Sequence, residues 1–306
     1  MQGQSELHKN VRNYGPIIIL SCLILLLLFL VPAHARTTQV SKGELASSTI
    51  QEIIQEVLPT EGFQTKLVLG NVVPTMVQAG IIDMTKVVAH YQGKGGIPAE
   101  KYAVLTQTSN IPLVVNKDNT LWLINILWPI GLSNYMRINE HSPIAGEKLS
   151  HYASTVGWTL GKIQYGSFYF NTFPLISLTT AQEQHIKEIA KVTFRPCCDN
   201  SSFFQDCNHG SAALGIIELG VKQGLSDNEI YKTILDFNSF WFQQEYLETA
   251  LYFKLVKHMD WKDVDPKLIL SKDYSSLSGW NKNVHTAMSK FPGLVPNVPS
   301  GSTCGA

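Results

Sequence analysis

The sequence has few charged residues and no cluster of them. Charged residues make up 16% of the 306, and 24 Lys and Arg balance 24 Asp and Glu. No basic run is present, and no segment interleaves basic with aromatic residues. Because proteins bind phosphate backbones through clustered Lys and Arg, we expect no nucleic-acid partner. No internal repeat is present, which argues against a solenoid or a propeller.

Cysteine is also scarce, with five residues in the whole chain. None of them forms a C-x-x-C pair, so the sequence contains neither the paired C-x-x-C of a zinc ribbon nor the C-x-x-C-H of covalent haem attachment. Three of the five nevertheless fall in one short segment, "RPCCDNSSFFQDCNHGSAALG" (195–215). This concentration makes the segment the main candidate for a functional site.

One long apolar run stands near the N-terminus, "PIIILSCLILLLLFLV" (16–31). Lys9 and Arg12 precede it, which is the charge order of an export signal. Its 16 residues exceed a usual signal core and fall short of the roughly 20 that span a bilayer. Residues 1–35 are therefore predicted to be a signal peptide or, alternatively, an N-terminal membrane anchor.

The residues after this run favour cleavage. Pro32 ends the helix, and Ala33 and Ala35 occupy the −3 and −1 positions of a cleavage site before Arg36. Under either reading the remainder of the chain is exported. We expect it on the periplasmic or extracellular face, and the membrane to be contacted only through residues 16–31.

A second apolar segment, "LWLINILWPIGL" (121–132), is only 12 residues long and contains Pro129. That length is too short for a membrane span and fits a buried helix.

The expected fold is mainly α, with a Cys/His-bearing loop between helices and a small mixed α/β N-terminal lobe. Residues 36–178 are predicted as a mixed α/β region of unknown role, 179–290 as a helical Cys/His module, and 291–306 as an irregular tail.

Helix signals are clearest in the second half of the chain. Capping boxes are expected at Thr180–Glu183 and at Ser226–Glu229. A helix from about Ser211 should end at Gln223, with Gly224 as a left-handed stop.

The four candidate ligands are Cys197, Cys198, Cys207 and His209, here called the Cys/His cluster. Thiolates and imidazole are the donors that zinc and copper prefer. Cys207 stands just before a predicted helix, where unpaired N–H groups favour a thiolate. The cluster is therefore predicted to bind a thiophilic metal. Asp206 or Asn208 is expected to orient His209 without binding the metal itself.

Two other interpretations of the cluster stay open. In a thiol–disulfide oxidoreductase, Cys207 would be the attacking thiolate, with Cys198 or Cys197 resolving, and the partner would be a thiol-bearing protein. In a structural module, Cys198 and Cys207 would form a staple and His209 would cap its helix. A bond between the adjacent Cys197 and Cys198 is disfavoured by strain.

The segment "FRPCCDN…FFQDCNHGSAALGIIELGVKQGLSDNEIYKTILDFNSFWF" resembles a block found in uncharacterised exported microbial proteins. It is more distantly similar to the cytochrome c maturation protein H family and to the PCYCGC-motif lipoproteins. Gly224, Ser226, Asp227, Glu229 and Ile230 match the "G-x-S-D-x-E-I" turn of the former. The resemblance covers about 50 residues and implies a helical thiol or metal module. The chain lacks both C-x-x-C and PCYCGC, so no catalytic role is carried over.

Overall fold

The computed structural model describes residues 42–298, with side chains from residue 47 onward. The chain divides into two units, Met1–Ser48 and Thr49–Ala306. The predicted signal or anchor at 1–35 lies outside the described residues, as do the last eight residues of the predicted tail. Within residues 42–298, no helix is both long and apolar enough to cross a membrane. This division does not test the domain boundary predicted between residues 178 and 179, which stays a prediction.

Helices dominate the described residues, which confirms a mainly α fold. Between residues 42 and 298 the only sheet is an antiparallel pair, β1 (Phe63–Gln64) and β2 (Val114–Val115), with Phe63 opposite Val115. Residues 36–178 were expected to be mixed α/β. Among the described residues, their only sheet is this two-stranded one. The α-helices, and the 3-10 and π turns labelled η, are α2 (Lys42–Val57), α3 (Val72–Gln78), α4 (Met84–Gln92), α5 (Ala99–Thr106), α6 (Thr120–Ser133), η1 (Arg137–His141), η2 (Leu149–His151), α7 (Ala153–Val156), η3 (Gly166–Phe168), α8 (Thr180–Val192), α9 (Asn208–Lys222), α10 (Asp227–Trp241), α11 (Gln243–Tyr252), η4 (Phe253–Lys257), η5 (Trp261–Asp263), α12 (Pro266–Ile269), α13 (Lys272–Ser275), α14 (Leu277–Trp280), η6 (Asn281–His285) and α15 (Thr286–Met288).

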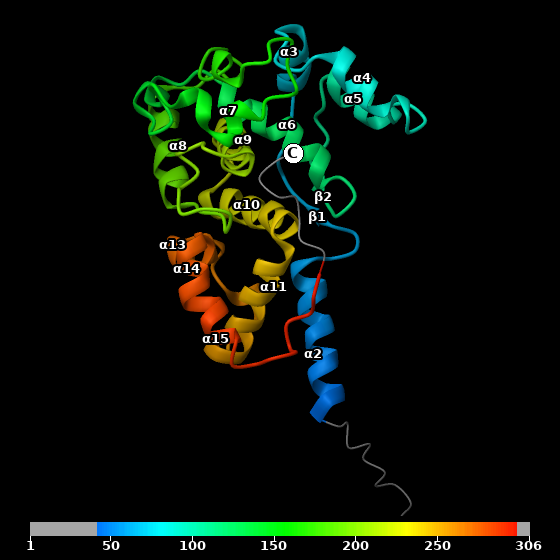
Figure 1. Cartoon of the computed structure of the whole chain (residues 1–306), viewed down its shortest axis with the longest axis vertical. Helices are drawn as coiled ribbons and strands as arrows, with labels where there is room; N and C mark the ends of the chain where they lie inside the picture. The colour runs from blue at the N-terminus through cyan, green and yellow to red at the C-terminus, as the bar shows by residue number, and fades with distance from the viewer. Residues whose placement is uncertain (1–41, 299–306) are drawn as a thin grey trace, which may run out of the picture. The chain divides into compact units, whose positions relative to one another are not determined.

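Helices α6 and α9 pack against each other more extensively than any other pair in the described residues; both are labelled in Figure 1. Two glycines allow their backbones to approach. A Cβ on Gly131 would lie 1.9 Å from Ser211 O, and one on Gly215 would lie 2.6 Å from Leu127 O. The apolar segment 121–132 is therefore a largely buried helix, as its length predicted. This pairing holds the first turn of α9 in the protein interior.

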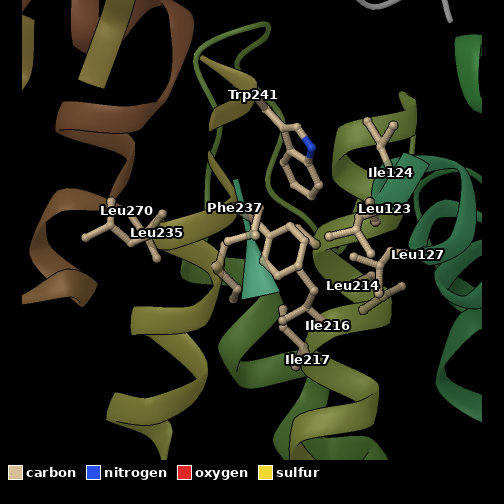
Figure 2. Close-up of a cluster of buried hydrophobic side chains, with 14 of the residues drawn as sticks. Leu123, Ile124, Leu127, Leu214, Ile216, Ile217, Leu235, Phe237, Trp241 and Leu270 are labelled. Carbon is tan, nitrogen blue, oxygen red and sulfur yellow. The ribbon is translucent and has the colours of Figure 1, made fainter. Parts of the chain in front are cut away.

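Side chains of α6, α9 and α10 converge on a shared core, together with Leu270 (Figure 2). Phe237 and Trp241 of α10 are 0% and 1% exposed, as the helical spacing predicted. Burying side chains of this size contributes about 1.5–3 kcal/mol each, so this core fixes the helices that carry the candidate site. The residues labelled in the figure are Leu123, Ile124, Leu127, Leu214, Ile216, Ile217, Leu235, Phe237, Trp241 and Leu270.

The helix boundaries were predicted within a few residues. The capping box at Ser226–Glu229 is confirmed, and Gly224 has a left-handed φ of 73° as expected. At α8 the box lies one residue earlier than predicted, because the Thr179 side chain, not that of Thr180, accepts from Gln182 N. α9 begins at Asn208, three residues before Ser211, because a cysteine provides its cap.

Candidate metal and thiol site

Cys207 is the N-cap residue of α9. Its backbone is extended (φ −132°, ψ 164°), and its Sγ accepts a hydrogen bond from Gly210 N at 3.4 Å. A sulfur in the place of the usual hydroxyl or carboxylate cap satisfies one of the otherwise unpaired amides of the first turn. The same geometry exposes Cys207 Sγ to the positive end of the helix dipole, which favours its thiolate form.

The loop before Cys207 is held by hydrogen bonds from several parts of the chain. Ser202 N donates to Thr193 O at 2.8 Å, and this bond closes the loop on itself. On its far side, Ser154 N donates to Asp206 O at 3.1 Å, and Ser154 Oγ donates to Gln205 O at 2.6 Å. These bonds turn the loop back on itself. Its two ends, Cys197 and Cys207, therefore lie close together although they are ten residues apart in sequence.

Three of the four residues in the Cys/His cluster are brought together. One sulfur each from Cys197 and Cys207 and one ring nitrogen of His209 lie within 4.8 Å of one another. The two sulfurs are 3.7 Å apart. A disulfide requires about 2.05 Å, so the structure presents these two residues as thiols in contact.

Cys198 belongs to a second, overlapping group. Its sulfur lies within 4.8 Å of Cys207 Sγ and of a carboxylate oxygen of Asp206, but it is not part of the group that contains His209. The four predicted ligands and Asp206 thus form two triads that share Cys207. The structure forms no Cys198–Cys207 staple, and Cys304 lies outside the described residues.

Arg195 is a site residue that the sequence reasoning missed. Its side chain is 1% exposed, yet it carries a charge. Arg195 Nε donates to Cys207 Sγ at 3.2 Å, and Nη1 donates to Asn200 O at 2.7 Å. Nη2 donates to Asp206 Oδ1 and, at 3.3 Å, to Phe204 O. Arg195 stands two residues before Cys197, but nothing in the sequence indicates that its side chain is buried against Cys207.

The guanidinium and the sulfurs affect one another's ionisation. Burial by itself lowers the pKa of Arg195, but the neighbouring sulfurs, Cys207 foremost, and the Asp206 carboxylate outweigh burial and raise it. A hydrogen bond from Cys197 lowers the pKa of Cys198. The bond between Cys198 and Cys207, together with burial, outweighs that effect and raises the pKa of Cys198 to about 11. Cys198 is therefore a thiol at neutral pH.

His209 does not cap its helix, because Cys207 holds that position. The His209 ring is 1% exposed and packs between two aromatic side chains. Its centroid is 5.5 Å from that of Trp241, in an edge-to-face arrangement, and 4.6 Å from that of Phe242. These contacts fix the ring beside the two sulfurs.

Asp206 takes a different role from the one expected. Its carboxylate accepts hydrogen bonds from the Arg195 guanidinium and, at 2.7 Å, from Asn200 Nδ2. Burial raises the pKa of Asp206 despite the opposing charge of Arg195. Asp206 thus positions the arginine that faces Cys207, whereas the sequence predicted that Asp206 would orient His209. Asn208 is buried in the first turn of α9.

These residues define a helical protein with a partly buried group of thiols, an imidazole and a compensated guanidinium, a group that can hold a metal ion. No protein-family model matches the chain, and neither does any curated protein or solved structure.

Proposed function

We propose that the protein binds a thiophilic metal ion, zinc or copper, at the Cys/His cluster. Cys197, Cys207 and His209 are the primary ligands. The observation that carries the proposal is the 3.7 Å separation of the two sulfurs. Two thiolates bound at about 2.3 Å to a tetrahedral ion lie about 3.8 Å apart, so the pair needs almost no movement to bind.

Charge balance supports the same ligand set. Arg195 and Asp206 offset each other. With Zn²⁺, the thiolates of Cys197 and Cys207 would then leave the group neutral, whereas with Cu(I) one negative charge would remain. A neutral group avoids the cost of an uncompensated charge in the protein interior. Cys198 is the reserve ligand, because its sulfur does not belong to the group that contains His209.

The cluster is further proposed to face an extracytoplasmic compartment. This rests on the sequence of residues 1–35, with its basic start, apolar run and Ala33/Ala35 pair. Thiols in such compartments are prone to oxidation, and a bound metal would protect them.

The same sulfur pair supports a second candidate function, thiol–disulfide exchange. Cys207, facing the guanidinium of Arg195, would attack a disulfide of a partner protein and release one partner thiol. Cys197, at 3.7 Å, would then displace the partner's second sulfur and leave a Cys197–Cys207 disulfide. Two electrons and two protons pass to the partner in this sequence.

The test is a competition titration of the full chain, purified anaerobically, with Zn²⁺ and separately with Cu(I). Cys197→Ser, Cys207→Ser and His209→Ala are expected to weaken binding by about 100-fold or more, because a lost ligand removes several kcal/mol. Cys198→Ser should change affinity by less than about tenfold. His185→Ala is the matched control, since His185 pairs with Asp227 at the surface.

Equal losses in Cys198→Ser and Cys197→Ser would contradict the assignment of primary ligands. The absence of metal binding by the wild-type chain would contradict metal binding altogether. In that case a Cys197–Cys207 disulfide that exchanges readily with glutathione would favour the second function.

A further inference from the structure

A pocket opens at the C-terminal helices, among residues that the Cys/His cluster does not use. Its volume is about 440 Å³, within the range of small-molecule sites. Polar and charged residues dominate its lining, which consists of Tyr252, Lys257, Lys272, Asp273, Tyr274, Ser276, Ser278, Gly279, Lys282 and Asn283. We call it the lysine pocket.

Two π-helical turns build this pocket. The turn η4 follows α11 and ends at His258, whose φ is 57°. The turn η6 continues α14, packs against α13 and also contacts α11 (α11, α13 and α14 are labelled in Figure 1). π turns are rare and recur at functional sites. Here η4 contributes Lys257, and η6 contributes Lys282 and Asn283.

The charge of the lining is positive. Three lysines and one aspartate give a net charge of +2 (three minus one). Tyr252 and Tyr274 add neutral polar side chains to the lining. The Asn283 amide already donates to Asp273 O at 2.9 Å, and the Ser278 side chain already bonds Asp199. Lysine is a mobile point charge that suits oxyanions, and no arginine lines the pocket to favour bidentate pairing with a single carboxylate.

The surroundings of the pocket already stabilise one carboxylate. Ser278 N donates to Asp199 Oδ1 at 2.7 Å. Leu277 N donates to Cys198 O at 3.0 Å beside it. Both amides are thus used by acceptors of the protein, and the charge of Lys272 also acts on the Asp199 carboxylate. The lysine side chains of the pocket are exposed, and Lys272 and Lys282 form no direct ion pair among the described residues.

We propose that the lysine pocket binds a small molecule that carries at least two negative charges on oxyanion groups. The three lysines neutralise the charges, and the tyrosine hydroxyls of the lining hydrogen-bond the oxygens. The proposal is independent of metal binding, since no residue of the Cys/His cluster lines the pocket.

The test is calorimetric titration of the full chain with pyrophosphate, with inorganic phosphate and citrate as separate arms. Lys272→Gln and Lys282→Gln should each weaken pyrophosphate binding by about threefold, and the double variant by about tenfold, as expected for exposed charges. Asp273→Asn should strengthen it, because a like charge is removed. Raising NaCl from about 0.05 M to about 0.5 M should weaken binding in every variant. Stronger binding of pyrophosphate than of citrate would identify the oxyanion as phosphoryl, and the reverse as carboxylate.

Lys290→Gln is the matched control, because Lys290 is exposed and does not line the pocket. It should leave the dissociation constant unchanged. The proposal is overturned if none of the three anions binds to the wild-type chain. It is also overturned if binding is the same in wild type and in the Lys272→Gln/Lys282→Gln variant, provided that both have the same circular dichroism spectrum.

Discussion

The Cys/His cluster and the lysine pocket hold their charges in opposite environments, one largely shielded from water and the other exposed to it. At the cluster, the Arg195 guanidinium is buried, and the partly buried Asp206 carboxylate is its counter-charge within the protein. At the pocket, the lysines are exposed and water screens them. A buried charge that loses its partner costs several kcal/mol, whereas an exposed one costs a fraction of that. Single substitutions should therefore be severe at the cluster and mild at the pocket.

The largest effect is expected from Arg195→Gln. It leaves the Asp206 carboxylate and the Cys207 sulfur without the guanidinium that compensates them. We expect a loss of about 3–5 kcal/mol in the free energy of unfolding, measured by urea denaturation under reducing conditions. Arg137→Gln, which removes an arginine that forms no ion pair within the described residues, should cost less than about 0.5 kcal/mol. Equal costs in the two variants would show that the Arg195 guanidinium does not compensate a buried charge at the cluster.

A smaller loss is expected from Gly210→Ala. A Cβ at this position would lie 2.5 Å from the Cζ of Arg195, so the guanidinium would have to move away from Cys207. We expect about 1–3 kcal/mol of destabilisation, typical of overpacking, together with weaker metal binding. At Gly93 a Cβ would meet no atom within 4 Å. If Gly93→Ala proved as costly as Gly210→Ala, the close packing around Arg195 could not be the cause.

Glu218 is a buried acid that forms no ion pair with a basic residue within residues 42–298. It therefore adds an uncompensated buried group to the comparison. It is 0% exposed, and its Oε2 accepts from Asn134 Nδ2 at 2.9 Å. Burial raises the pKa of Glu218 well above its usual range, against the hydrogen bond from Asn134. Its contribution to stability is therefore complete below the pKa of the unfolded chain, about 4.3, and is lost as the pH rises toward the folded value.

Glu218→Gln imitates the protonated form at every pH. The melting temperature of the variant minus that of the wild type should become more positive between pH 5 and pH 8, a range chosen because it lies above about 4.3. Glu229 is the partly exposed contrast, since hydrogen bonds from Lys66 and Ser226 lower its pKa to about 2. Glu229→Gln should therefore lose most stability at neutral pH and little near pH 2. If the difference in melting temperature between Glu218→Gln and the wild type did not change with pH, Glu218 would not be held neutral in the folded protein.

The sequence predicted the elements better than it predicted the contacts between them. Helical spacing identified Phe237 and Trp241 as core residues, because burial on one helix face leaves a local pattern. The role of Cys207 at a helix start was also readable. The position of Arg195 was not, because its burial depends on Gly210 and on the loop that returns to Asp206, and neither leaves a periodic signal. The lysine pocket was missed for the same reason, since its lysines come from separate elements.

The sequence also could not predict that Cys197 and Cys198 would belong to different groups of ligands. Cys197 and Cys198 are neighbours in sequence with the same chemistry. Successive side chains of a loop point in different directions, so one sulfur joins His209 and the other joins Asp206.

The most direct test of the central claim is X-ray absorption spectroscopy at the zinc edge, on the full chain loaded with one equivalent of Zn²⁺ under anaerobic conditions. We expect two sulfurs at about 2.3 Å and at least one imidazole nitrogen at about 2.0 Å. Cys197→Ser should lose one sulfur from this shell, and Cys198→Ser should keep both. A shell of oxygen and nitrogen alone would contradict a metal site built on Cys197 and Cys207.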